Sequence, residues 1–397
     1  MLSAGIICEY NPFHSGHSYL IRRLREYGAT HIVAVMSGNF VQRGDAAILS
    51  KHARALQALL CGADLVVELP LPWAVSGAER FALGGISLLD AMNVDLIGFG
   101  SECGNVDRLK EASQALTSPL LREAMRQALA KGSTFAAARQ DAVKQLYGIK
   151  TAELLRDPNN ILGIEYLKAI DRIGSGIVPI TVQRYGAVHD ATSGTGPYAS
   201  SGQIRNMLQN GQDCSALMPP AAFSVLQEEI RLKQAPASLF LAERAVLSRL
   251  RRMDRSDFAL LPDISEGLEN RVLNAVRQAV SLEELYRLIK TKRYPLARIR
   301  RIVLSAFLDL KAEYASGFPP YLRVLGIGKR GPEILQKAKG SGKLPIVSRP
   351  ADRNALESTA RKIADLESRA ADLYALCLPE VAPCGLDRTE KIITLPH

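Results

Sequence analysis

Long apolar runs are missing from this 397-residue chain. A membrane-spanning helix needs about 20 consecutive apolar residues, and no segment of the sequence approaches that length. The first residues also lack the basic stretch and following apolar core of a secretory signal peptide. We therefore expect a cytoplasmic protein that has no membrane partner.

Cysteine and the common metal and phosphate motifs are also scarce. The six cysteines are scattered without the spacing of a disulfide framework, which in a chain of this size indicates reduced thiols. The sequence contains no H-E-x-x-H and no paired C-x-x-C motif, so we predict no protein-held metal centre. The P-loop sequence G-x-x-x-x-G-K-[ST] is absent too, so a nucleotide would be held without its lysine.

Basic residues are distributed unevenly along the chain. Residues 1–210 carry 20 Lys and Arg against 18 Asp and Glu, whereas residues 211–397 carry 30 against 22. The first part alternates short apolar runs with helical periodicity, which is typical of a parallel sheet covered by helices. The second part has helical periodicity nearly throughout. We predict an α/β, Rossmann-like domain over residues 1–210 and a basic, mostly helical domain over residues 211–397.

The most informative motif is the segment 11–17, N-P-F-H-S-G-H. It follows an apolar strand at Ala4–Cys8 and precedes a helix at Ser18–Tyr27. A helix N-terminus presents unpaired N–H groups and the positive end of the helix dipole, so it attracts phosphate. Gly16 lets the phosphates approach the backbone, and His14 and His17 can donate hydrogen bonds as negative charge develops. This pattern predicts a site that cleaves a nucleotide between its α and β phosphates.

Two simpler interpretations of the histidine pair must be weighed. Two histidines within four residues occur by chance on surfaces, and a pair three apart can form half of a metal site. The strand before the motif and the helix after it favour the phosphate interpretation, because a motif needs this structural context.

Two further loops follow predicted strands. Ser37–Phe40 comes after a strand at His31–Met36, and Gly100–Glu102 comes after a strand at Asp95–Phe99. Ligands of open parallel sheets bind at the carboxyl ends of strands, so these loops should converge with the histidine motif on one cleft. Ser37, Asn39, Lys51 and Arg54 lie at or just beyond the end of the strand at His31–Met36, where Lys51 or Arg54 could neutralise a carboxylate. A solvated helix face is an equally simple interpretation of Lys51 and Arg54.

The rest of the first part contains a helical insertion and a second strand-to-helix passage. Residues Leu109–Tyr147 have helical periodicity and a rather polar composition, which indicates an insertion or a lid over the cleft. Tyr198–Arg205 is rich in hydroxyls and ends in an arginine. Additional strands are expected at Asp64–Leu69 and Ile177–Arg184.

The second part contains two stretches that combine cations with a tyrosine. Lys290–Pro295 runs into Arg298, Arg300 and Arg301, and Tyr321–Gly326 leads to Gly328–Gly331. Phosphates need cations, and an unstacked base can lie on an aromatic ring or a guanidinium plane. A solvated basic face without a partner remains the competing interpretation. Our candidate RNA contacts are Lys292, Arg293, Arg300, Lys329 and Arg330.

Taken together, these motifs resemble the His-x-Gly-His nucleotidylyltransferase superfamily and, within it, the tRNA(Met) cytidine acetate ligase family. The resemblance covers essentially the whole chain. It rests on residues 9–17 (EYNPFHSGH), 37–44 (SGNFVQRG), 62–70 (GADLVVELP), 98–102 (GFGSE), 158–163 (PNNILG) and 291–294 (TKRY). One departure is Gly202, which stands where the superfamily usually has Ser or Thr before x-Ile-Arg.

The resemblance implies an HUP-type nucleotidylyltransferase domain and an enzyme that forms acetyl-AMP from acetate and ATP, with Mg²⁺. The acetyl group would pass to N4 of the wobble cytidine of elongator tRNA(Met), giving N4-acetylcytidine. His14 and His17 would be catalytic. The residues implied to bind ATP are Ile7, Cys8, Glu9, Tyr10, Asn11, Pro12, Phe13, His14, Ser15, Gly16, His17, Ser18, Tyr19, Leu20, Gly100, Asn159, Asn160, Arg184, Ser201 and Arg205.

Two alternatives stay open from the sequence. One is a nucleotidylyltransferase that adenylylates a small phosphate-bearing acceptor, although such enzymes do not need a basic helical domain of this length. The other is an RNA-binding protein whose nucleotide site is regulatory. The sequence leaves the oligomeric state open.

Overall fold

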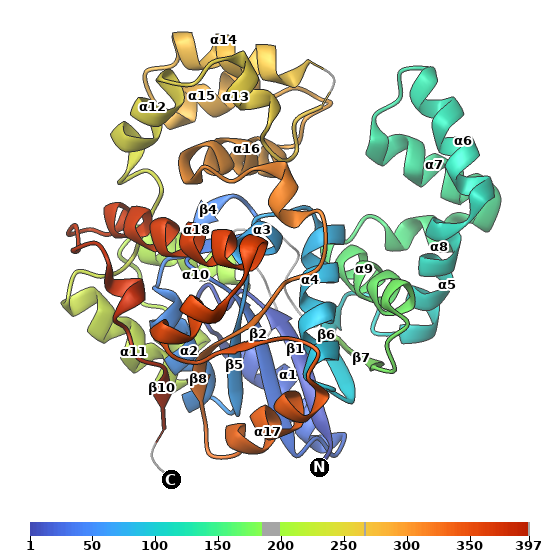
Figure 1. Ribbon diagram of the computed structural model, residues 1–397. Coiled ribbons are helices and arrows are strands. Elements are labelled where there is room, and N and C mark those ends of the chain that lie inside the picture. Colours follow the sequence, from blue (N-terminus) through green and yellow to red (C-terminus); the bar gives the residue numbers. More distant parts are fainter. Residues whose placement is uncertain (185–198, 266, 396–397) are drawn as a thin grey trace.

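The computed structural model describes residues 1–184, 199–265 and 267–395. Its centre is an eight-stranded sheet with the order β10-β8-β5-β2-β1-β6-β7, and β9 pairs with β8 (Figure 1). The pairs formed by β1, β2, β5, β6 and β7 are parallel, as predicted, and β8 is antiparallel to β5. The strands are β1 (Ser3–Cys8), β2 (His31–Ser37), β5 (Leu65–Leu69), β6 (Leu96–Ser101), β7 (Val178–Gln183), β8 (Leu322–Ile327), β9 (Ile346–Val347) and β10 (Ile393–Thr394).

The strand order places a topological switch point at β1. From β1 the chain runs outward to β2 and β5, and it then returns to β6 and β7 on the other side of β1. The carboxyl ends of β2, β1 and β6 therefore lie side by side. Crevices of this kind are where open α/β sheets bind ligands. The predicted convergence of the loops that follow these three strands is confirmed.

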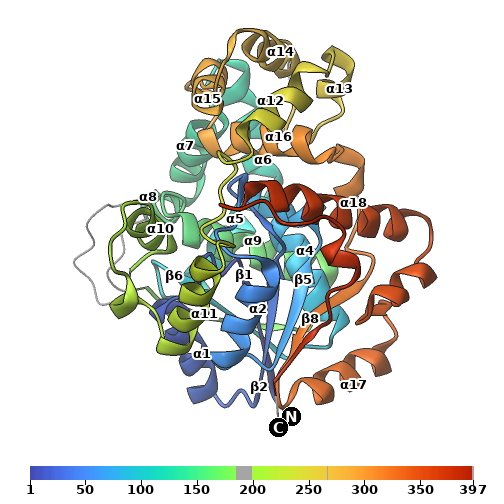
Figure 2. The same cartoon turned by 90° about the vertical axis from the view of Figure 1, so that its left-hand side faces the viewer.

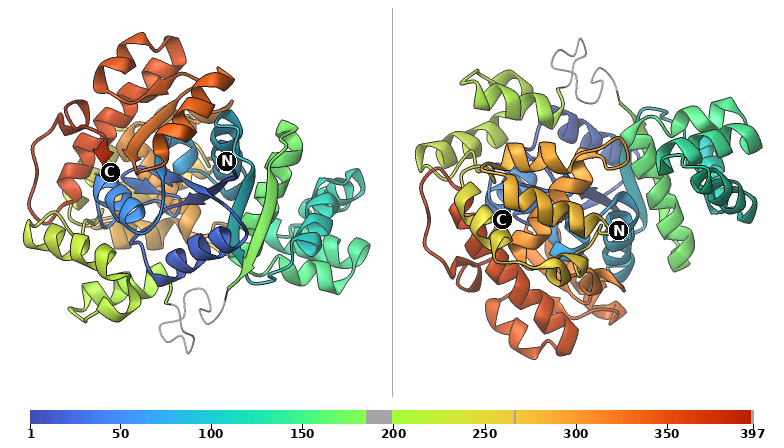
Figure 3. Two further views of the ribbon diagram at one scale, coloured as in Figure 1. Left: turned by 90° about the horizontal axis from the view of Figure 1, so that it is seen from below. Right: turned by 90° about the horizontal axis from the view of Figure 1, so that it is seen from above.

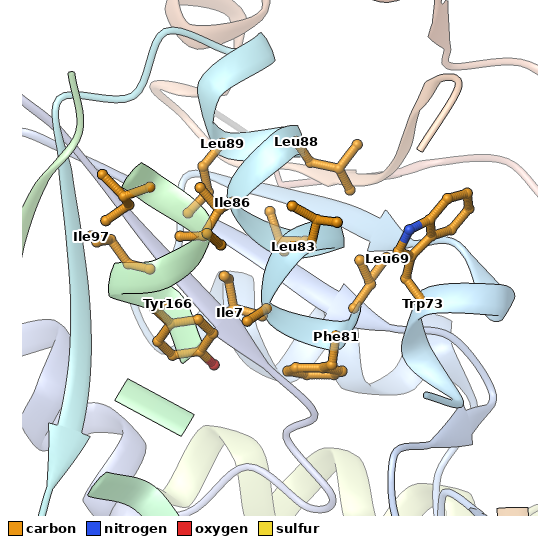
Figure 4. Packing of buried hydrophobic residues seen from close by; sticks show 14 of the residues in the cluster. Ile7, Leu69, Trp73, Phe81, Leu83, Ile86, Leu88, Leu89, Ile97 and Tyr166 are labelled. Atoms are coloured by element: carbon orange, nitrogen blue, oxygen red, sulfur yellow. The ribbon is translucent and has the colours of Figure 1, made fainter. Parts of the chain in front are cut away.

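Helices cover both faces of the sheet (Figure 2). Alternate side chains of β1 point to opposite faces: Ala4 and Ile6 pack in the same cluster as residues of α1, α2 and α11, whereas Ile7 packs in the cluster of α4 and α9. Figure 4 shows Ile7 among the α4 side chains. The helices are α1 (Ser15–Glu26), α2 (Lys51–Leu60), α10 (Ser201–Gln209) and α11 (Pro220–Arg231), then α3 (Leu71–Ala74), α4 (Ala78–Ala91), α9 (Pro158–Ile173) and α17 (Gly331–Ser341).

Two helical lobes extend from the sheet (Figures 1 and 3). The cap, residues 243–308, lies over the carboxyl edge and has its own apolar core; it contains α12 (Glu243–Arg251), α13 (Arg255–Ala259), α14 (Leu268–Gln278), α15 (Leu282–Ile289) and α16 (Leu296–Leu308). The arm, residues 119–154, projects beside it; it contains α6 (Pro119–Ala130), α7 (Phe135–Tyr147) and α8 (Ile149–Leu154), and α5 (Val106–Thr117) joins it to β6.

The second part of the chain returns to the sheet after the cap. Strands β8 and β10 pair at its edge, and α18 (Ser358–Tyr374) packs against α16 and α3. Strand β8 was not expected, because we interpreted residues 321–326 only as a basic stretch. The central sheet takes strands from both sides of residue 210. The domain boundary that we place at this residue stays a prediction. Among the described residues, no helix is long and apolar enough to cross a membrane.

Candidate functional site

The two motif histidines form a reciprocal cap at the start of α1. His14 is the N-cap residue, and its Nδ1 accepts a hydrogen bond from the backbone N–H of Gly16 at 3.1 Å. The Nδ1 of His17 accepts one from the backbone N–H of His14, also at 3.1 Å. The rings stack with their centroids 3.7 Å apart. The arrangement is a capping box in which imidazoles replace the usual hydroxyl and carboxylate.

This geometry fixes the protonation of both rings. Because each Nδ1 accepts a hydrogen bond, the neutral ring carries its proton on Nε2. Burial, aided by the cations Arg184 and Arg205, lowers the pKa of His14 to about 3. Burial and the neighbouring His14 and Arg184 lower the pKa of His17 well below its ordinary value. Both histidines are therefore neutral near pH 7 and act as hydrogen-bond donors through Nε2–H.

Two arginines bring positive charge to the same place. Arg205, on α10, donates to the backbone carbonyl of Asn11 at 2.7 Å. Arg184 follows β7, and its Nε is buried without a hydrogen-bond partner among the described residues. Burial lowers the pKa of Arg184, and Glu102 opposes that shift. A half-buried guanidinium whose buried Nε–H is an unused donor suits an anionic ligand.

A glycine lies beside each of these arginines, but only Gly100 makes a close contact. A Cβ on Gly100 would lie 3.1 Å from Cγ of Arg184, so the arginine side chain packs across a bare backbone. A Cβ on Gly202 would lie 3.7 Å from Oγ of Ser200 and 3.8 Å from Nη2 of Arg205. These are ordinary contact distances, so the departure at Gly202 leaves Arg205 in position beside the histidines. Ser201 begins α10, behind the N-cap Ser200; Tyr198 lies outside the described residues.

The remaining motif residues support this loop. Ile7 and Cys8 end β1 and are buried, and Ser18, Tyr19 and Leu20 continue α1. The backbone N–H of Phe13 donates to Gln57 at 3.4 Å, and Oγ of Ser15 donates to the carbonyl of Leu217 at 3.0 Å. Asn11 accepts from the N–H of Ile48 at 2.8 Å, and Asn11–Pro12 is a cis peptide bond. Tyr10 and Phe13 pack their rings against His17.

Glu102 ties the end of β6 to the start of α9. Its carboxylate accepts from Nδ2 of Asn159 at 2.6 Å and from the backbone N–H of Asn160 at 2.9 Å. The buried amide of Asn160 is engaged at both ends, because it accepts from the N–H of Cys103 at 2.9 Å and donates to Asp157 at 3.2 Å. Asn159 is only half-buried. Of the two asparagines, Asn159 is therefore the one with a surface that a ligand can reach.

The S-G-N-F-V-Q-R-G segment forms a hairpin of β3 (Phe40–Val41) and β4 (Asp45–Ala46). The N–H of Gln42 donates to the carboxylate of Glu9 at 2.7 Å, which joins the hairpin to the histidine loop. Gly44, at φ +77°, packs against the backbone of α16 at Arg301. The hairpin is thus held between the histidine loop and the cap. Sequence reasoning did not identify this pair of strands, because each has two residues.

The candidate acid-binding residues have separate environments. Oγ of Ser37 is fully buried and has no hydrogen-bond partner among the described residues. Oδ1 of Asn39 accepts from the backbone N–H of Lys51 at 2.8 Å. Arg54, which is buried, donates to the carbonyls of Ser37, Gly38 and Glu9. Arg54 therefore organises the backbone of two loops, a role that its position on a helix did not reveal.

Lys51 belongs to a buried cluster of charges. Its ammonium lies 3.0 Å from Glu68 and 2.6 Å from Asp387. Arg323 bridges the same two carboxylates, and Arg353 lies 2.7 Å from Asp387. The Lys51 charge is thus already balanced within the protein. Its proposed contact with an acid stays a prediction.

The candidate RNA contacts lie at opposite ends of the sheet. Lys292 and Arg293 are exposed just before α16, and the guanidinium of Arg300 lies 5.7 Å from the ring centroid of Tyr286, so all three belong to the cap. Lys329 and Arg330 follow β8, and Arg330 donates to the carbonyl of Thr30 at 2.6 Å, at the amino edge of the sheet. The cap, which holds the first three residues, lies over the carboxyl edge of the sheet (Figure 1). The turn between β8 and α17, which holds the other two, lies at the amino edge.

The fold and the capped histidine pair are those of a nucleotidyl transferase, and a family model described as HIGH Nucleotidyl Transferase matches residues 1–387. A protein of Thermoanaerobacter sp. (strain X514) named tRNA(Met) cytidine acetate ligase is 38% identical, covering 98% of this chain and 99% of that protein. A protein of Syntrophomonas wolfei with the same name is 37% identical, covering 96% of each.

The chain is also similar in structure to solved proteins. The crystal structure of Thermotoga maritima TmcAL bound with alpha-thio ATP has a TM-score of 0.92 and 31% identity and covers 100% of both chains. The apo form of the same protein has a TM-score of 0.93 and 32% identity, again covering 100% of both chains. The chain belongs to the tRNA(Met) cytidine acetate ligase family.

Proposed function

We propose that this protein is an ATP-dependent acetate ligase that modifies elongator tRNA(Met). It forms acetyl-AMP and pyrophosphate from acetate and ATP, and it then transfers the acetyl group to N4 of the wobble cytidine. The observation that carries the proposal is the reciprocal His14–His17 cap beside Arg184 and Arg205, at the switch point of the sheet. The names of the relatives support the same activity.

In the first step a carboxylate oxygen of acetate attacks the α-phosphorus and the bond to pyrophosphate breaks. Catalysis of such a step depends mainly on alignment and on stabilising the charge that spreads over the phosphates. The N–H groups at the start of α1, the two Nε2–H donors and the two guanidinium groups provide hydrogen bonds and positive charge for the phosphates. Neutral imidazoles donate without needing to gain or lose a proton.

Acetate would bind next to the α-phosphate. The hydroxyl of Ser37, which has no hydrogen-bond partner in the described part of the chain, is our candidate donor for a carboxylate oxygen, and Asn39 lies two residues beyond it. Mg²⁺ usually retains several waters and is held by one or two carboxylates together with substrate phosphates. No group of three or more His, Cys, Asp or Glu side chains in the described part of the chain is arranged to hold a metal ion. We therefore propose that Mg²⁺ enters with the ATP phosphates, whose charge it would neutralise.

The second step explains why activation is needed. The exocyclic amine of cytosine is a poor nucleophile because its lone pair is delocalised into the ring. It attacks the acetyl carbonyl of acetyl-AMP, AMP leaves, and the amine loses its proton. The cytidine must be unstacked from its loop to reach this carbonyl. We propose that the basic cap, through Lys292, Arg293 and Arg300, holds the tRNA so that the anticodon loop reaches the carboxyl edge of the sheet; Lys329 and Arg330 are separate candidates.

The direct test uses purified protein, ATP and radiolabelled acetate. We expect acetate-dependent exchange of pyrophosphate into ATP without RNA, and label in tRNA when the methionine elongator transcript is added. Loss of both activities in His14→Ala supports the proposed roles. Exchange that requires a phosphate ester in place of acetate would contradict the proposal and favour an adenylyltransferase. Binding of tRNA without any nucleotide chemistry would favour a regulatory nucleotide site.

A further inference from the structure

The arm is rooted in the proposed nucleotide site. The chain reaches the arm from β6 through α5 and leaves it into α9, so Glu102 lies on the segment before the arm and Asn159 on the segment after it. The hydrogen bonds from Asn159 and Asn160 to Glu102, at 2.6 and 2.9 Å, tie these two flanking segments together. A partner held by the arm is therefore positioned relative to the bound nucleotide.

Several large apolar side chains on the arm face solvent. Leu120 is 70% exposed, Phe135 60% and Ile149 55%, and Tyr147 and Leu146 are also exposed. They occur on all three arm helices. With Leu129, which is also exposed, the arm presents six such residues. Scattered single residues of this kind are ordinary, but this concentration on one lobe is typical of an interaction surface.

The charge of the arm indicates what kind of partner it accepts. Residues 119–154 contain six Lys and Arg against three Asp and Glu. Lys131, Lys144 and Lys150 are exposed. The guanidinium of Arg139 lies 5.9 Å from the ring centroid of Phe135. A second copy of this surface would meet it with like charge, whereas a polyanion with exposed aromatic rings would be attracted by the cations and could stack on Phe135.

We propose that the arm is a second RNA-binding surface, which grips the tRNA on the side of the nucleotide cleft away from the cap. The inference rests on the proposed function, because it takes tRNA as the substrate. Phosphates of the RNA contact Lys144 and Lys150, and an unstacked base lies against Phe135 and Arg139. The cap and the helices α6 and α7 of the arm both lie on the side of the carboxyl edge of the sheet, so one RNA can touch both (Figure 1).

The test compares three variants by tRNA binding and by acetate-dependent pyrophosphate exchange. Lys144→Glu/Lys150→Glu should weaken binding of the methionine elongator transcript about tenfold at about 0.1 M salt and reduce the slope of log K against log salt by about 2. Phe135→Ala should weaken binding several-fold without changing that slope. Lys339→Glu, an exposed reversal on α17 at the amino edge, is the matched control and should bind like the wild type.

The outcomes separate this inference from the proposed function. Pyrophosphate exchange in the absence of RNA should be unchanged in all three variants, which also reports that they are folded. Wild-type tRNA affinity in both arm variants would overturn the inference while leaving the function intact. A change in oligomeric state by sedimentation in Phe135→Ala, with unchanged tRNA affinity, would reassign the surface to a second copy. Absence of acetate-dependent exchange in the wild-type protein would count against the proposed function itself.

Discussion

His14 and His17 each accept a hydrogen bond that closes the first turn of α1, with their ring centroids 3.7 Å apart. Because Nδ1 of each ring already accepts the capping hydrogen bond, it cannot also bind a ligand. Capping therefore leaves Nε2–H as the nitrogen of each ring that can face a ligand, and we expect a mutation at either position to have both a structural and a chemical effect.

These two effects can be separated at His17. In His17→Asn the amide oxygen can accept from the N–H of His14 in place of Nδ1, whereas His17→Ala cannot. We expect His17→Ala to lose about 1 kcal/mol of stability and His17→Asn to lose less. Both should lose at least about 100-fold in acetate-dependent pyrophosphate exchange, because neither offers the distal donor. Urea denaturation and the exchange assay measure the two quantities. Activity near the wild-type level in His17→Asn would show that only the cap matters.

The low pKa of His14 predicts how stability depends on pH. The folded protein holds the pKa at about 3 because the ring is buried beside Arg184 and Arg205, whereas the unfolded chain has the ordinary value of 6.5. Below pH 6.5 the unfolded state binds the additional proton, so stability falls as the pH falls from about 6.5 toward 3. His14→Asn lacks this group, so its stability relative to the wild type should increase between about pH 7 and pH 5 in urea titrations. A constant difference would contradict the depressed pKa.

We expect substitution of Asn160 to lower mainly the stability of the protein and substitution of Asn159 to raise mainly the KM for ATP. Asn160→Ala removes a buried amide and leaves the partly buried N–H of Cys103 without its partner, and we expect a destabilisation of about 1–3 kcal/mol by chemical denaturation. Asn159→Ala should change stability less and raise the KM for ATP, because this residue is the partly exposed one of the pair. An unchanged KM in Asn159→Ala together with a raised KM in a folded Asn160→Ala would reverse the assignment.

Gly44→Ala should loosen the contact between the hairpin and the cap. The new Cβ would collide with the α16 backbone at Arg301, and the φ of +77° is unfavourable for alanine. We expect a loss of about 2 kcal/mol or more in thermal or urea unfolding. Gly340→Ala is the control, because a Cβ there meets nothing within 4 Å and a helix favours alanine over glycine. It should leave stability unchanged or raise it.

Charge reversal should affect RNA binding differently at the two ends of the sheet. Lys292→Glu/Arg293→Glu lies in the cap and should weaken tRNA binding and flatten its salt dependence, with ATP binding unchanged. Lys329→Glu/Arg330→Glu lies at the amino edge beside Thr30 and should have the smaller effect. Filter binding over a range of salt concentrations measures both. A larger effect of the second pair would mean that the RNA wraps around to the far edge.

The hydrophobic periodicity of short segments predicted the first strands and helices of the sheet domain. The alternation of β1, α1 and β2 and the loops at their carboxyl ends could be located from the sequence, since each element has its own periodicity and the switch point follows from chain order. Strand β8 could not, because its partner β5 lies far away in the sequence and Arg323 looks like a surface cation until Glu68 and Asp387 are seen around it. The tautomers of His14 and His17 likewise could not be predicted from the motif H-x-G-H, because they follow from the capping hydrogen bonds.

The antiparallel pairing of β8 with β5 has a consequence for synthesis of the protein on the ribosome. Roughly 250 residues separate the two strands, and at about 5–20 residues per second the nascent chain displays the unpaired edge of β5 for roughly 10–50 s. An unpaired apolar edge readily recruits other strands. A fragment ending near residue 210 would keep that edge permanently bare, so the nucleotide-binding half should be insoluble alone and should depend on chaperones until the last strands emerge.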